Sequence, residues 1–200
     1  MKQPSKLVST GKSRFARKVV LASLAVAAVT VASPQAFAAV ICSSPALNVP
    51  VTTSGIYVNF VTGASGTSGS GTAGWDLNPW ASSSILRFFS SASASNTTRY
   101  VGTGTTVDLL ASGTMIDGSS TLATAGVNLP GAFQAGVTNG YVGIAFNNEA
   151  TATINYGWAS MTTTGPNGFP ATINQYCYQN DGTGIMAGTT PVSLQSYSID

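Results

Sequence analysis

Two tryptophans in segment 74–80, GWDLNPW, mark the clearest candidate for ligand binding in this chain. Trp75 and Trp80 flank a short loop that also contains Asp76 and Asn78. Exposed indole rings can stack on sugar rings, while carboxylate and amide groups beside them bind hydroxyls. The loop therefore predicts a carbohydrate-binding site. The alternative, which the apolar residues between the rings favour, is that both tryptophans cap the core, because large aromatic side chains are mostly buried.

Catalytic chemistry has little support in the sequence. The chain contains no histidine, the commonest general base in enzymes. Ser-His-Asp and Cys-His mechanisms are therefore excluded. Two carboxylates about 5–10 Å apart could hydrolyse a glycoside. However, Glu149, the only glutamate, is expected to be a solvated turn residue, and Asp108 is expected to accept a structural hydrogen bond. We predict a non-catalytic protein that needs no cofactor.

Two oxygen-rich loops are weak candidates for calcium binding. Asp117 lies in the sequence DGS and Asp181 in NDG. Calcium takes 6–8 oxygen ligands, and neither loop has the spacing of an EF-hand. Because a plain Asp-Gly turn accounts for each loop, we predict that no metal is bound there.

Cys42 and Cys177 are the only cysteines. An even number of cysteines in an exported protein predicts a disulfide, and the alternative is two unpaired buried thiols. The bond would tie the N-terminal part of the folded domain to its last strong strand.

The first 38 residues have the three parts of a bacterial Sec signal peptide. Residues 1–18 hold six of the eight Lys and Arg, and residues 19–31 form an uncharged run rich in Val, Leu and Ala. The sequence Ala36-Phe37-Ala38 then provides an A-x-A cleavage site. The apolar run is shorter than the roughly 20 residues that a membrane-spanning helix needs. We predict cleavage after Ala38, secretion, and one domain over residues 39–200.

Charge within residues 39–200 limits the possible partners. The segment contains no Lys, two Arg and six acidic residues, so its net charge is −4. Binding to nucleic acid or to anionic lipid requires clustered basic residues. We therefore predict that the mature chain binds neither nucleic acid nor membranes.

Period-2 alternation of apolar and small or polar residues dominates residues 139–178. Alternation of this kind predicts half-buried β-strands, here a three-stranded meander with turns at 147–148 and 165–168. Ile173 and Cys177 are expected to share a face, with Tyr176 and Tyr178 on the other. One buried face is expected to collect the large side chains of the first two strands: Ile144, Phe146, Ile154, Tyr156 and Trp158.

Shorter strands are expected on both sides of this meander. Residues 56–61 and 84–90 alternate in the same way, and residues 99–101 and 106–111 are further candidates. Residues 62–74 contain no large side chain and are expected to form a mobile loop, whereas the tail from 189 is expected to add an edge strand. Eight to ten short strands with frequent turns predict an all-β fold, namely an antiparallel, jelly-roll-like β-sandwich, with a β-barrel as the second choice.

Three pieces of the sequence together resemble one class of secreted bacterial proteins. They are GWDLNPW followed by SILRFF, then GYVGIAFNNEATATINYGWASMTTTGPNGFPATI, then YCYQNDGTGIMAG. In this order they are similar to a domain found in PEP-CTERM proteins, which exosortases sort after export. The resemblance covers most of residues 74–188 and implies a role at the cell surface or in a biofilm matrix. It implies no catalytic residues. Since the class ends in a sorting tail that residues 189–200 do not show, we expect release.

The sequence therefore predicts a non-catalytic exported protein with a structural or adhesive role at the cell surface or in the extracellular matrix. One alternative is a carbohydrate-binding module that uses Trp75 and Trp80. A self-assembling filament subunit is another alternative, because strand edges without Lys are poorly protected against pairing. The expected partners are extracellular polysaccharide or further copies of the chain.

Overall fold

The computed structural model describes residues 39–93, 96–126 and 128–191. All described residues belong to one compact unit, Ala36–Asp200. The predicted signal peptide lies outside the described residues, as does most of the tail expected to form an edge strand. Within the described part, no helix is long and apolar enough to cross a membrane.

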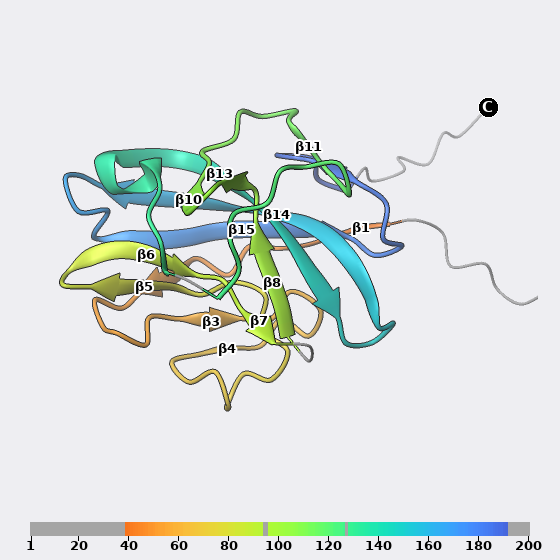
Figure 1. The fold of residues 1–200 in the computed structure, drawn as a ribbon, viewed down its shortest axis with the longest axis horizontal. Coiled ribbons are helices and arrows are strands. Elements are labelled where there is room, and N and C mark those ends of the chain that lie inside the picture. The colour runs from red at the N-terminus through yellow and green to blue at the C-terminus, as the bar shows by residue number, and fades with distance from the viewer. Residues whose placement is uncertain (1–38, 94–95, 127, 192–200) are drawn as a thin grey trace, which may run out of the picture. The chain divides into compact units, whose positions relative to one another are not determined.

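The largest sheet is antiparallel and has the strand order β1-β15-β14-β13-β8-β7, with β2 also paired to β15 (Figure 1). Three long strands form its middle, and they are the meander expected from the alternation in residues 139–178. The turn between the first two is Glu149–Ala152, two residues later than predicted. The strands are β1 (Val40–Ser43), β2 (Leu47–Val49), β7 (Ala92–Ser93), β8 (Asn96–Tyr100), β13 (Gly136–Asn148), β14 (Thr153–Thr164) and β15 (Ala171–Gln179).

A second layer packs on one face of this sheet. It consists of a three-stranded sheet of order β12-β6-β5, the pair β3–β4, and a short 3-10 helix η1 (Ala132–Ala135). The sheets are not closed into a barrel, so the prediction of a sandwich is confirmed and the barrel alternative is wrong. The strands are β3 (Tyr57–Val58), β4 (Ser65–Gly66), β5 (Pro79–Ser82), β6 (Ile85–Phe89) and β12 (Asn128–Leu129).

Two small ribbons complete the fold. The first pairs β9 (Gly102–Thr103) with β10 (Thr106–Val107), and the second pairs β11 (Met115–Ile116) with β16 (Ile185–Met186). The β11–β16 ribbon contacts β14 and contributes Ile116 and Ile185 to a cluster with Trp158. The central strands are therefore covered on both faces.

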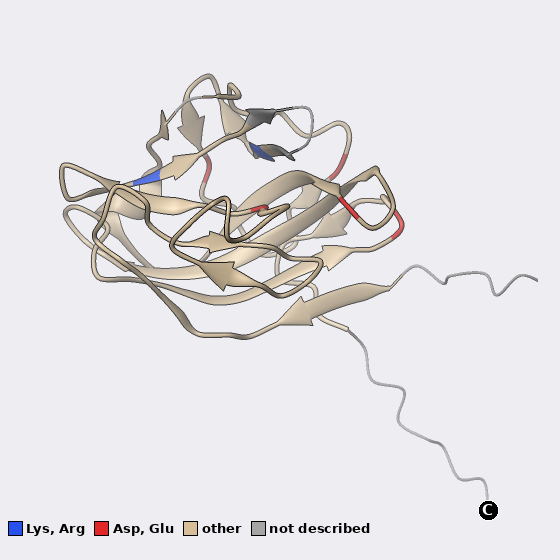
Figure 2. Cartoon of the chain, turned by 90° about the horizontal axis from the view of Figure 1, so that it is seen from below, with Lys and Arg blue, Asp and Glu red and all other residues tan. Residues whose placement is uncertain are grey.

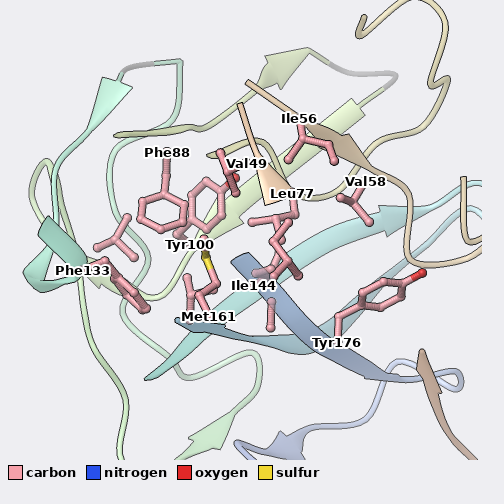
Figure 3. Packing of buried hydrophobic residues seen from close by; sticks show 14 of the residues in the cluster. Val49, Ile56, Val58, Leu77, Phe88, Tyr100, Phe133, Ile144, Met161 and Tyr176 are labelled. Atoms are coloured by element: carbon pink, nitrogen blue, oxygen red, sulfur yellow. The ribbon is translucent and has the colours of Figure 1, made fainter. Parts of the chain in front are cut away.

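The main core lies between the large sheet and the second layer. Leu77, Val58 and Phe88 from the second layer meet Ile144 and Met161 from the large sheet, and all five are buried (Figure 3). A smaller core on the opposite face contains Trp158, Cys177, Val101, Ile116, Ile185 and Ala187.

The prediction that Ile154, Tyr156 and Trp158 share a face with Phe146 is wrong. The register pairs Phe146 with Asn155 and places Trp158 opposite Gly143. Residues directly opposite each other lie on the same face of a sheet, so the two sets point to opposite faces. Trp158 is buried in the smaller core, whereas Ile154 is 43% exposed and Tyr156 is partly buried.

The prediction that Ile173 and Cys177 share a face is also wrong, because β15 contains a bulge. Ser160 pairs with Gln175, but the next residue, Met161, pairs with Ile173. Asn174 is therefore an extra residue, and such an insertion reverses the side-chain alternation along the strand. Ile173 packs in the main core and Cys177 in the smaller one.

Charged groups are sparse over this framework. Figure 2 shows them as isolated spots on a ribbon that carries mainly uncharged residues. The Arg99 guanidinium donates two hydrogen bonds to the Ala123 carbonyl oxygen, at 2.8 and 3.0 Å. This basic side chain is therefore used within the fold.

Candidate functional site

Trp75 lies inside the domain and not on its surface. Only 7% of the residue is exposed. Its ring meets the ring of Tyr57 edge-on, with 5.2 Å between centroids, and lies 5.9 Å from the ring of Phe89. Trp75 therefore caps the core, as the alternative interpretation of the sequence held.

Asn78 is likewise a structural residue. Its side chain is 2% exposed and donates hydrogen bonds to the carbonyl oxygens of Ser54, at 3.0 Å, and Ile56, at 2.9 Å. Its backbone N–H donates to the Tyr100 hydroxyl at 3.1 Å. All these groups belong to the protein, so the amide joins segment 54–56 to the start of β5 and is not offered to a sugar.

Trp80 is partly buried on β5, where the backbone at Gly55 passes close to it. Gly55 has a φ of +59°, and a Cβ there would lie 2.5 Å from the Trp80 Cα. Because Trp75, Asp76 and Asn78 are buried, the four residues do not form the exposed platform that the sequence predicted for sugar binding.

Asp76 is the most unusual group in the structure. Its side chain is fully buried, and Oδ2 accepts a hydrogen bond from the Phe60 N–H at 2.8 Å. Within the described part of the chain, Oδ1 has no hydrogen-bond partner. Burial raises the pKa of this carboxyl well above its usual range, and the negative charge of Glu149 raises the pKa further. Asp76 therefore holds a proton readily.

Glu149, on the turn between β13 and β14, is near enough for its charge to act on this carboxyl. Its Oε1 accepts a hydrogen bond of 2.6 Å from Asn59 Nδ2, which also donates to the Ala73 carbonyl oxygen at 2.8 Å. The glutamate is exposed, as predicted, but its carboxylate is held by the protein and not only by solvent. We call Asp76 and Glu149 the acid pair.

Two neighbouring residues orient the acid pair. Asn59 donates to Glu149, and the next residue, Phe60, donates to Asp76. The Asn59 side chain is itself fixed, because its Oδ1 accepts hydrogen bonds from two backbone N–H groups, those of residues 61 and 62. The two carboxyl groups come from segments that lie 73 positions apart, so sequence spacing gave no sign of the pair.

The acid pair is poorly suited to hydrolysing a glycoside. A general acid must reach the leaving-group oxygen of its substrate. Asp76 has no exposed surface. What the pair offers is a buried carboxyl group and an exposed carboxylate, both fixed by hydrogen bonds from segment 59–60.

The two loops considered for calcium are ordinary turns. Asp117 Oδ1 accepts hydrogen bonds from the backbone N–H and hydroxyl of Ser119, and Asp181 Oδ1 does the same with Thr183. In each case the side-chain hydrogen bond is the main cause that lowers the aspartate pKa. No cluster of three or more His, Cys, Asp or Glu side chains suited to a metal occurs among the residues that the structure describes.

The predicted disulfide between Cys42 and Cys177 is present. The two residues face each other in the antiparallel pairing of β1 with β15. Cys177 is fully buried in the smaller core, where Trp158 is its partner on the neighbouring strand. The bond therefore fastens an edge strand to the middle of the domain.

Comparisons of the chain with family models, curated proteins and solved structures gave no match.

Replacing Asp76 by Asn should remove one component of the pH dependence of stability. Because the folded-state pKa of Asp76 is raised, its favourable contribution is complete below the unfolded pKa of about 3.9 and is lost as pH rises through the folded value. Asp76→Asn should therefore be more stable than wild type at alkaline pH, by about 1–3 kcal/mol, the typical penalty of an unsatisfied buried polar group.

Urea unfolding of both proteins between pH 4 and pH 9, in buffer with EDTA, measures this effect. Glu149, Tyr100 and Tyr178 are the titratable groups that interact electrostatically with Asp76, and they are present in both proteins. The difference between the two curves therefore isolates Asp76. A constant difference across the pH range would contradict a raised pKa.

Proposed function

We propose that this chain is an exported bacterial protein with a non-catalytic structural or adhesive role at the cell surface or in the extracellular matrix. The observation that carries the proposal is the disulfide between Cys42 and Cys177. Disulfides persist in oxidising compartments and are rare in the bacterial cytosol. The bond thus agrees with the signal-peptide pattern of residues 1–38.

Contacts at Ala39 support cleavage directly before this residue. Its backbone N–H donates to Asn180 Oδ1 at 2.9 Å, and its carbonyl oxygen accepts from the Asn180 N–H at 3.2 Å. Cleavage after Ala38 would turn this N–H into an ammonium group, which still donates hydrogen bonds. The folded end of β1 therefore tolerates removal of the preceding residues.

The low charge of the chain supports a role in binding uncharged surfaces. The described part of the chain is rich in Ser, Thr and Asn, and its charged residues are few (Figure 2). Hydroxyl and amide groups bind sugar hydroxyls or other uncharged surfaces without strong charge repulsion. The expected partners are extracellular polysaccharide or further copies of this chain.

One feature, the exposed edge strand β1, favours self-association of the chain as the form of this structural role. β1 is an edge strand, paired only with β15, and Ile41 on it is 40% exposed. No Lys lies on this edge to oppose pairing with another strand. Pairing of β1 with the opposite edge of the next copy, β7, would give a filament, whereas pairing of β1 with β1 would give a dimer.

Expression of the full chain in a bacterium with a Sec pathway tests the proposal. We expect a product that begins at Ala39, is found outside the cytoplasm, and has no thiol that alkylates without reductant. Ala38→Asp should block cleavage and serves as the control. An unprocessed cytoplasmic product with two free thiols would overturn the proposal.

A further inference from the structure

We propose that Asp76 and Glu149 bind a single calcium ion, which joins segment 59–76 to the turn between β13 and β14. This site lies apart from the loops at Asp117 and Asp181. It would add a ligand-dependent contact to the domain and does not depend on the location of the protein.

The first observation is the unpartnered oxygen of Asp76. The carboxyl group is fully buried, and Oδ2 is fixed by the Phe60 N–H. Oδ1 remains without a partner among the described residues. A buried polar atom is normally satisfied, because leaving it unpaired costs free energy. A bound cation would satisfy Oδ1 and offset the charge of the acid pair.

The second observation is the shape of the backbone around Glu149. Gly74, two residues before Asp76, has a φ of +67°. A Cβ at this position would lie 3.0 Å from the Glu149 Cδ and 2.9 Å from Asn59 Nδ2. The glycine therefore lets the backbone approach the glutamate closely. Asn59 Nδ2 donates to one of the two carboxylate oxygens, Oε1. The proposed site uses the other oxygen, Oε2.

The donor set fits calcium better than other ions. Both side chains supply oxygen ligands, which suit hard cations. No cysteine thiolate and no histidine imidazole takes part. Calcium accepts irregular arrangements of carboxylates, backbone carbonyls and water, whereas magnesium requires a nearly octahedral shell. Since the pair supplies only two carboxylates, the remaining ligands would be carbonyl oxygens and water. We therefore expect weak binding, with a Kd of about 0.1–1 mM, as in extracellular modules.

Thermal unfolding of the purified exported domain at pH 8 tests the site. With 10 mM calcium instead of EDTA, we expect Tm to rise by about 3–6 °C, and magnesium should have a smaller effect. The rise should be lost in Asp76→Asn and in Glu149→Gln. Asp117→Asn and Asp181→Asn, which alter acidic turns elsewhere, should keep it and serve as matched controls.

Terbium luminescence gives a second measurement that does not depend on stability. Trp75 adjoins Asp76 in the chain, so its excitation should sensitise a bound terbium ion, and calcium should compete for the site. Equal Tm shifts in all variants would place the ion elsewhere and overturn the proposal. It would also be overturned if neither calcium nor terbium produced a response.

Discussion

Truncation of Phe146 and of Trp158 to Ala should each destabilise the domain by about 3–5 kcal/mol, even though the two side chains lie on opposite faces of one sheet. Both residues are almost completely buried. Removing either ring loses its transfer free energy and leaves a cavity, because the surrounding strands relax only partly. Phe146 would leave a cavity against Phe60 and Tyr178, and Trp158 one against Tyr141.

Ile154→Ala is the matched control for this prediction. Ile154 lies on the same strand and face as Trp158 but is 43% exposed, so its truncation should cost less than about 1 kcal/mol. Urea unfolding at neutral pH measures all three variants. If Ile154→Ala were as destabilising as Trp158→Ala, the β11–β16 ribbon would have to cover more of β14 than the structure shows.

Loss of the disulfide should also destabilise the domain strongly. Replacing both Cys42 and Cys177 by Ala should lower the free energy of unfolding by about 2–5 kcal/mol. The bond closes a loop with a sequence separation of 135, so its removal gives the unfolded chain much more freedom. Part of the cost is local, because Cys177 is buried beside Trp158.

Thermal melts with and without reductant measure this effect. Wild type should lose several degrees of Tm when reductant is present, whereas the double Ala variant should show the same Tm in both conditions. An unchanged wild-type Tm after complete reduction, verified by intact mass, would contradict the prediction.

The period-2 patterns were sufficient to predict the strands and the sandwich, but not which face each side chain occupies. Alternation shows which residues of one strand share a face. Which residues of two neighbouring strands share a face depends on the pairing register and on bulges. The turn between Phe146 and Ile154 was predicted two residues too early, at 147–148 and not at Glu149–Ala152. The extra residue at Asn174 had no sign in the sequence. Consequently Trp158 and Cys177 were assigned to the wrong neighbours.

The tryptophan loop is buried by contacts that the sequence does not show. Trp75 was a candidate for ligand binding because Asp76 and Asn78 lie beside it in the sequence. The structure buries these polar groups too, by pairing Asn78 with backbone carbonyls and Asp76 with the Phe60 N–H. Contacts between residues so far apart in sequence cannot be obtained from local patterns. The disulfide could be predicted because only two cysteines were available to pair.

The position of the disulfide has a consequence for a protein that is under tension. A force applied between residue 39 and the end of the described chain enters at β1 and leaves beyond β15. Cys42 and Cys177 join these two strands covalently, so the load passes from one strand to the other through the sulfur atoms. The chain between them contains most of both cores and carries almost none of that load, whereas β16, with Ile185 of the smaller core, lies outside the bond. If the protein holds cells or polysaccharide together, pulling on its two ends would detach β16 from β11 and stretch the segments outside the bond, while the two main layers of the sandwich would stay folded.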